Sequence, residues 1–97
     1  MNDDVDLTTL RIRIEGFVQA VGYRNFAITE ARKLLLDGWI RNSSDGSVEV
    51  LVSGPTKPVE AFVTQLMRGP PGARVNNIEM QQAEPPEVKG FNRRTSF

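Results

Sequence analysis

Apolar and polar residues alternate along several short stretches of the chain, a pattern typical of β-strands that bury one face. Leu10, Ile12 and Ile14 point one way in the first stretch, and charged residues occupy the positions between them. Val residues alternate in the same way between positions 48 and 52. The pattern predicts strands at about 7–15, from Trp39 to about 41, at 47–53, at about 73–82 and at 91–97.

Two other stretches carry apolar residues at three- and four-residue spacing, which predicts amphipathic helices. The first helix is expected from Arg24 to Leu36 and the second from Thr56 to Gly69. We expect Thr56 to cap the second helix and Gly38 to provide the left-handed turn after the first. The residues expected to face the core, with Met67 as a gap-filler, are Ala27, Ala31, Leu34, Leu35, Val59, Phe62, Val63, Leu66 and Met67.

The order of these elements predicts the fold class. Asp45-Gly46 favours a tight hairpin between the second and third strands. The resulting β-α-β-β-α-β order, with a further short strand, is typical of the ferredoxin-like α+β sandwich, an antiparallel sheet with two helices on one face. Residues 1–6 are expected to be a mobile tail and residues 7–97 a single domain. Trp39 is expected in the core or at its edge.

Composition narrows the chemistry open to this chain. Twelve basic and twelve acidic residues cancel among its 97, so no bulk charge recruits nucleic acid or an anionic membrane. His and Cys are absent, which excludes disulfides, thiolate sites and the commonest general base. No apolar run approaches the roughly 20 residues of a membrane span, and the acidic N-terminus lacks signal-peptide features. We therefore expect a cytoplasmic monomer without a cofactor, whose catalysis would depend on positioning and fixed dipoles.

The loop between the first strand and the first helix is the strongest candidate site. It runs from Gly16 to Gly22 and leads into a helix N-terminus, where unpaired backbone N–H groups and the helix dipole favour an anion such as phosphate. Arg24 lies in the first turn of that helix, where a cation is unfavourable by roughly 0.3–1 kcal/mol. A bound phosphate would reverse that cost, although an exposed and merely tolerated Arg24 explains the pattern equally simply.

Two segments together resemble the signature of the acylphosphatase family. The first is Gly16-x-Val18-Gln19-x-Val21-Gly22-Tyr23-Arg24, and the second runs from Gly38-Trp39-Ile40-Arg41-Asn42 to Glu49. Two motifs in the right order, joined by a helix of the right length, are far more specific than a lone glycine loop. The resemblance also implies a terminal strand at the edge of the sheet.

The resemblance implies an enzyme that hydrolyses small-molecule acyl phosphates to a carboxylate and inorganic phosphate without a metal. It implies that Arg24 binds the phosphoryl group and that Asn42 orients the attacking water. Neither nucleic acid nor a membrane is expected as a partner, because the basic and acidic residues balance. The phosphate would lie on the backbone N–H groups of Gly16, Phe17, Val18, Gln19, Ala20, Val21, Gly22 and Tyr23.

Two loop residues depart from the family pattern. Ala20 stands where relatives usually carry Gly, so a positive φ there would strain the loop by roughly 1–2 kcal/mol. If no positive φ is needed, Ala20 instead rigidifies the loop. Phe17 stands where relatives are often basic, which changes the rim of the site and leaves the backbone donors in place.

Several residues also have purely structural interpretations. Asn42 precedes a turn, where Asn is common, and Gln19 is expected to brace the loop or the first helical turn. Arg93 and Arg94 are expected to solvate an edge strand more than to add positive potential to a site.

Three other functions share this fold. A regulatory module would bind phosphate without turnover, but it would not need Asn42. A domain of a larger carbamoyl-phosphate-processing protein is disfavoured by the initial Met1 and the lack of Cys-rich modules. An RNA-binding sheet would need aromatic pairs to stack bases, and Arg11 and Arg13 do not replace them.

Overall fold

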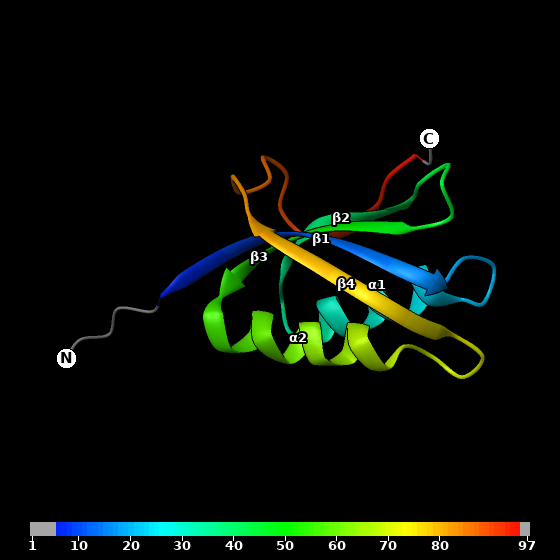
Figure 1. The fold of residues 1–97 in the computed structure, drawn as a ribbon. Helices are drawn as coiled ribbons and strands as arrows, with labels where there is room; N and C mark the ends of the chain where they lie inside the picture. The colour runs from blue at the N-terminus through cyan, green and yellow to red at the C-terminus, as the bar shows by residue number, and fades with distance from the viewer. Residues whose placement is uncertain (1–5, 96–97) are drawn as a thin grey trace.

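The computed structural model describes residues 6–95 as a five-stranded sheet and two helices (Figure 1). The predicted tail at residues 1–6 lies outside this range except for Asp6, whose carbonyl oxygen accepts a hydrogen bond from the Thr56 N–H. The elements are β1 (Leu7–Phe17), α1 (Tyr23–Lys33), β2 (Asp37–Asn42), β3 (Val48–Pro55), α2 (Thr56–Arg68), β4 (Arg74–Gln82) and β5 (Phe91–Arg93).

The sheet has the strand order β4-β1-β3-β2-β5, and both helices cover the same face of it (Figure 1). The predicted ferredoxin-like α+β fold is confirmed, with β5 at one edge as expected. Neighbouring strands are antiparallel except β2 and β5, which run parallel, so the sheet is mixed. In that parallel pair Ile40 lies opposite Arg93, which brings the end of the chain close to the end of β2.

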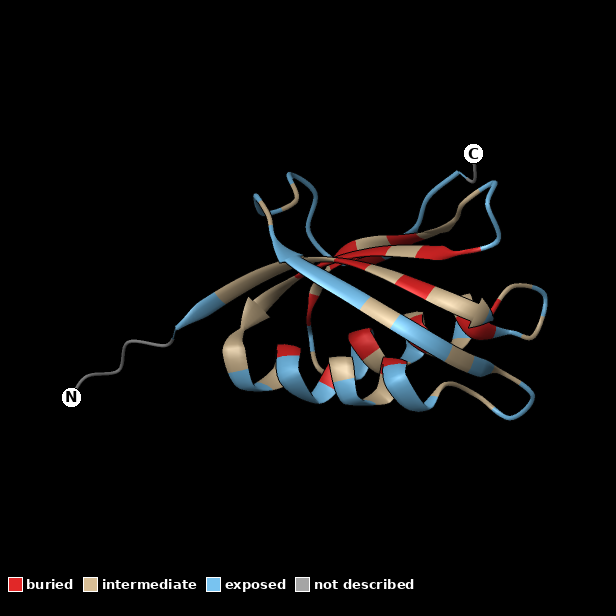
Figure 2. Cartoon of the chain, viewed as in Figure 1, coloured by how far each residue is buried: buried red, intermediate tan, exposed pale blue. Residues whose placement is uncertain are grey.

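The core lies between the sheet and the helices, where the buried segments gather in Figure 2. The predicted alternation is confirmed in β1 by Ile12 and Ile14, which are fully buried. The valines of β3 at positions 48, 50 and 52 are buried beside them. Phe62 of α2 meets Phe91 of β5 edge to face at 5.5 Å between ring centroids, which ties the terminal strand to the core.

The first helix ends earlier than predicted. Leu35 adopts the left-handed conformation (φ 58°), and the N–H groups of Leu35 and Leu36 bond to the carbonyls of Arg32 and Ala31. This is a Schellman turn, so the prediction that Gly38 makes the left-handed turn is wrong, and Leu35 is 87% exposed instead of facing the core. Gly38 lies within β2, where a Cβ atom would sit 1.8 Å from the carbonyl oxygen of Leu51.

Two predictions about α2 are also wrong. Thr56 makes no side-chain cap, because its hydroxyl bonds to the carbonyl oxygen of Asp6 and to the Thr8 hydroxyl. Met67 is 60% exposed and fills no gap in the core. Val59, Phe62 and Leu66 are buried as predicted. Neither described helix is long and apolar enough to cross a membrane.

Trp39 lies outside the core, contrary to the prediction. It points to the face of the sheet opposite the helices, since its neighbours Gly38 and Ile40 are the buried residues of β2. The guanidinium groups of Arg11, Arg41 and Arg94 lie 5.3, 5.1 and 4.6 Å from its ring centroid. Trp39 therefore supports a cluster of arginines on the open face by cation–π contacts.

Candidate active site

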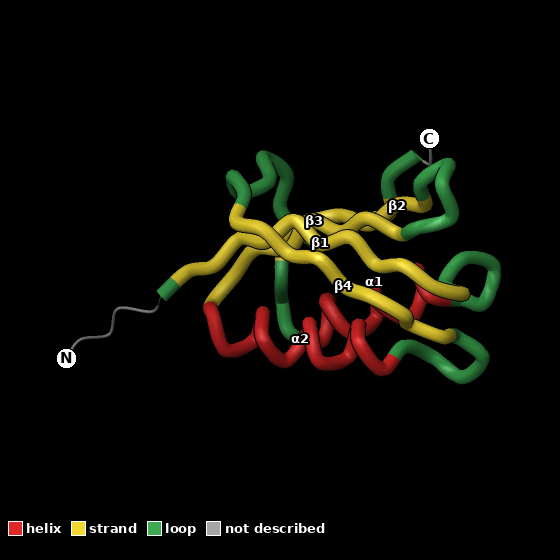
Figure 3. Tube along the Cα trace, in the orientation of Figure 1, coloured by secondary structure: helices red, strands yellow, loops and turns green. Residues whose placement is uncertain are grey.

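The loop between β1 and α1, the β2–β3 hairpin and the end of β5 gather at the same end of the sheet (Figures 1 and 3). A bulge between Glu15 and Gly16 shifts the register of β1 against β4, and the pairing then continues to Phe17 opposite Arg74. A Cβ atom at Gly16 would sit 2.1 Å from the carbonyl oxygen of Arg74, so only glycine allows this close strand approach. The bulge directs the chain from β1 into the loop.

A small cavity of about 130 Å³ opens between these segments. The loop, the first turn of α1 and the ends of β2 and β5 all contribute residues to its lining. Its lining residues are Val18, Ala20, Gly22, Tyr23, Arg24, Asn25, Asn42 and Arg93.

Arg24 lies half-buried in the first turn of α1, beside the cavity. The helix N-terminus has no side-chain cap, and its first turn contains no acidic residue. Partial burial, together with the nearby positive charge of Arg93, lowers the pKa of Arg24. A guanidinium remains protonated through the physiological range, so the cavity combines a fixed cation with the N–H groups of a helix terminus.

Asn42, the last residue of β2, brings a side-chain amide to the same cavity. Its Oδ1 atom is buried and accepts no hydrogen bond from any described residue. A buried oxygen without a donor costs about 1–3 kcal/mol. Because Asn42 lines the cavity, its side-chain amide is placed to accept a hydrogen bond from a water molecule bound there.

Gln19 connects the loop to the hairpin that carries Asn42. Its Nε2 atom donates to the carbonyl oxygens of Ser43 and Ser47, at 2.9 and 2.8 Å. The predicted bracing role of Gln19 therefore extends across the site, from the loop to the hairpin. Asp45 orders the same hairpin from within, because its Oδ1 accepts hydrogen bonds from the N–H and hydroxyl of Ser47.

Tyr23 fixes the other end of the loop. Its side chain is buried, and its hydroxyl donates a 2.6 Å hydrogen bond to the carbonyl oxygen of Leu66 in α2. Burial raises the pKa of the Tyr23 phenol well above its usual range, so the hydroxyl stays protonated as a donor. The loop is thus held at Gln19 and at Tyr23, on either side of its exposed tip.

Ala20 has φ 63°, so the loop does require a positive φ at this residue. We expect Ala20→Gly to stabilise the protein by roughly 0.5–1 kcal/mol, because relief of strain outweighs the entropy that glycine adds to the unfolded chain. Urea unfolding measures this change. Ala61→Gly, at an exposed position within α2, is the matched control and should destabilise by about 1 kcal/mol. Equal destabilisation by both substitutions would contradict the strain at Ala20.

We expect Gln19→Ala to lower kcat by about 10- to 100-fold with a smaller effect on KM, because the loop and Asn42 would lose their relative position. Hydrogen exchange of the amides of residues 43–47 should accelerate in the same variant. Gln19→Glu keeps the side-chain volume but removes the donor, so it should cause a similar loss. Full activity in Gln19→Glu would show that the two hydrogen bonds do not position the site.

The Asp45 hydrogen bonds predict a pH dependence of stability. The Ser47 hydroxyl and N–H, with help from Arg13, lower the pKa of Asp45 to about 2 in the folded protein. Stability from this group is therefore present above the unfolded pKa of about 3.9 and is lost as pH falls towards 2. Urea midpoints between pH 5 and pH 2 should fall more in the wild type than in Asp45→Asn. Parallel pH profiles of the wild type and Asp45→Asn would show that Asp45 does not cause the pH dependence of stability.

The structure brings together only part of the predicted phosphate site. The predicted residues that line the cavity are Val18, Ala20, Gly22, Tyr23, Arg24 and Asn42. Gly16 and Phe17 belong to β1, and Phe17 is 59% exposed. Gln19 and Val21 do not line the cavity.

Sequence reasoning missed Asn25 and assigned Arg93 to the solvation of an edge strand. Arg93 instead lines the cavity and donates to Oδ1 of Asn25. The sequence shows that residue 93 is basic. Only the parallel pairing of β5 with β2 shows that this residue lies near the end of β2. Arg94, the next residue, lies against Trp39.

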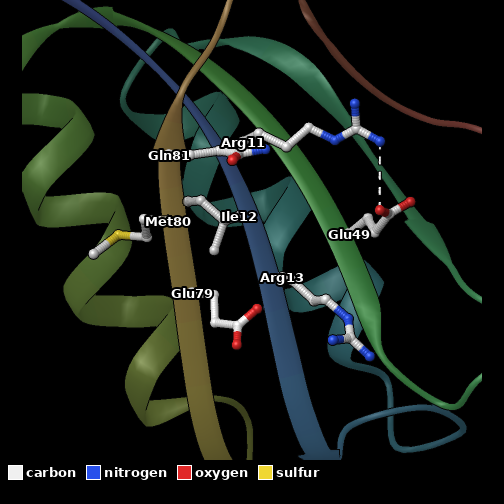
Figure 4. Close-up of a pocket in the computed structure, with 7 residues that line it drawn as sticks. All are labelled: Arg11, Ile12, Arg13, Glu49, Glu79, Met80 and Gln81. Atoms are coloured by element: carbon white, nitrogen blue, oxygen red, sulfur yellow. Dashed lines mark hydrogen bonds and ion pairs between the residues drawn. The ribbon is translucent and has the colours of Figure 1, made fainter.

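A second hollow, of about 390 Å³, lies on the open face of the sheet (Figure 4). Its charged groups neutralise one another, since Arg11 contacts Glu49 at 3.4 Å and Arg13 lies opposite Glu79 in the sheet. It lies away from both the loop and Asn42. The smaller cavity therefore has the more distinctive chemistry.

The sequence and the fold both match known proteins. The acylphosphatase family model matches residues 10–93. An acylphosphatase of Azoarcus sp. strain BH72 is 47% identical over 92% of this chain and 91% of its own length. The structure of an acylphosphatase from Coxiella burnetii superposes with a TM-score of 0.86 at 29% identity, covering 92% of this chain and 94% of that one. HypF from T. kodakarensis contains a similar region, with TM-score 0.80 and 32% identity, covering 90% of this chain and 12% of HypF. The chain belongs to the acylphosphatase family.

Proposed function

We propose that this chain hydrolyses acyl phosphates. Arg24 and the loop N–H groups hold the phosphoryl group, and Asn42 orients the water molecule that attacks it. Family membership supports acyl phosphate hydrolysis as the reaction. The roles of individual residues are our proposal, which also takes residues 7–97 as one monomeric domain that needs no metal.

The reaction can proceed without a basic side chain. The oxygen of the bound water forms a bond to phosphorus as the bond from phosphorus to the bridging oxygen breaks. The carboxylate leaves with that electron pair, and one water proton passes to a phosphoryl oxygen to give inorganic phosphate. Negative charge on the phosphoryl oxygens is stabilised by Arg24 and by backbone N–H groups at the start of α1.

The observation that supports this proposal is that Asn42 lines the same cavity as Arg24, while its buried Oδ1 accepts no hydrogen bond from a described residue. A site that only binds phosphate needs the loop and the cation. An amide oxygen that lacks a donor is suited to a further ligand with a proton to donate, and the attacking water is such a ligand.

Hydrolysis of benzoyl phosphate by the purified protein in excess chelator tests the proposal. We expect turnover that the chelator does not reduce. No turnover, with inorganic phosphate still bound in an Arg24-dependent manner, would replace the enzyme by a regulatory phosphate-binding module. Turnover that the chelator abolishes would overturn the proposed independence from metal.

A further inference from the structure

The cavity contains a second arginine that the proposed mechanism does not use. Arg93 lines it together with Arg24 and Asn42, although it comes from the opposite end of the chain. Its position is fixed by the backbone, because β5 pairs in parallel with β2 and places Arg93 opposite Ile40. Ile40 is two residues before Asn42, so β2 and the edge strand β5 bring Asn42 and Arg93 to one end of the sheet.

The side chain of Arg93 is also held in place. One of its terminal nitrogens donates to Oδ1 of Asn25, which follows Arg24 in the first turn of α1. A guanidinium has five N–H donors in a planar fork, so this contact leaves others for a ligand. Partial burial and, to a lesser extent, the positive charge of Arg93 lower the pKa of Arg24. No carboxylate occurs among the described residues that line the cavity.

We propose that Arg93 is a second phosphoryl-binding residue, and that the site holds the dianionic phosphoryl group between the guanidinium groups of Arg24 and Arg93. This inference rests on the proposed function, because it concerns the same cavity. Two like charges that share a small cavity repel each other, and a dianion between them converts that repulsion into attraction. The fork of Arg93 suits phosphate oxygens, and Asn25 orients it.

Binding of inorganic phosphate tests this role without relying on turnover. We expect the Kd for phosphate, measured by calorimetry, to rise about 10- to 100-fold in Arg93→Gln. Arg94→Gln is the matched control, since it makes the same charge change on the adjacent residue, whose side chain lies against Trp39. Its Kd should stay within about twofold of the wild type. If Arg93→Gln does not fold, phosphate binding is measured instead in Arg93→Lys, which keeps the charge but not the planar fork of donors.

The pH dependence of binding separates ligand contact from a structural role. Wild-type affinity should increase as phosphate loses its second proton near neutral pH, and this increase should be smaller in Arg93→Gln. Unchanged phosphate affinity in Arg93→Gln would overturn the proposal. Equal weakening by Arg94→Gln would overturn it too, because it would reduce the effect to net charge. Wild-type turnover of benzoyl phosphate, measured in parallel, tests the proposed function separately.

Discussion

Replacing Arg24 with Ala is expected to lower kcat/KM for an acyl phosphate at least about 10²- to 10³-fold, with the fold retained. The guanidinium is the fixed cation of the site, and charge on the phosphoryl oxygens increases as the reaction proceeds. Stability of the unliganded protein should stay the same or rise slightly, since the substitution removes a cation from the positive end of α1. Steady-state kinetics and urea unfolding on the same preparation measure both effects.

Arg24→Lys distinguishes charge from geometry. Lysine keeps the charge but offers no planar fork, so it should recover part of the activity lost in Arg24→Ala. Full turnover in Arg24→Ala at equal folded content would show that Arg24 does not bind the phosphoryl group in the reaction. Loss of folding in Arg24→Ala would instead make its role structural.

Replacing Asn42 with Ala is expected to lower kcat by about 10²- to 10⁴-fold, the range for removal of a group that assists proton movement from the attacking nucleophile. Affinity for inorganic phosphate should change much less, because the loop and Arg24 remain. Stability should not fall, since the substitution removes a buried oxygen that has no donor among the described residues. Kinetics, phosphate calorimetry and urea unfolding together give this signature.

The alternative role of Asn42 predicts the opposite signature. If the side chain served the turn after β2, Asn42→Ala would destabilise the protein and accelerate hydrogen exchange in the hairpin, with turnover lost only through unfolding. Asn42→Ser keeps a polar group on a shorter side chain. We expect this variant to stay folded and its turnover to remain slow. Fast turnover in either variant would exclude Asn42 as the residue that orients water.

The sequence predicts the fold well where side-chain periodicity decides burial. Ile12 and Ile14 are buried as expected, because a strand with one wet face leaves little freedom in their orientation. Prediction failed where a local preference gave way to tertiary contacts. Leu35 makes the turn that glycine favours, whereas Gly38 lies in β2, where its lack of a Cβ atom lets the Leu51 carbonyl approach. Trp39 lies outside the core, where Arg11 of β1, Arg41 of β2 and Arg94 from the end of the chain contact its ring.

The candidate site divides in a similar way. Arg24 and the loop are contiguous in sequence, so their motif predicts a shared location, and the cavity does contain Arg24 and part of the loop. The motif does not contain Arg93, which reaches the cavity only through the pairing of β5 with β2. The link from Gln19 to the hairpin was equally invisible, since it joins residues 24 and 28 positions apart.

Hydrolysis of an acyl phosphate in ¹⁸O-labelled water shows whether the water molecule attacks phosphorus, as proposed, or the carbonyl carbon. If the oriented water attacks phosphorus, the label enters inorganic phosphate and the carboxylate keeps both of its original oxygens. Mass spectrometry of both products after a single turnover gives the answer. We expect label in phosphate alone. Label in the carboxylate would place the attack at the carbonyl carbon and contradict the roles given to Arg24 and Asn42.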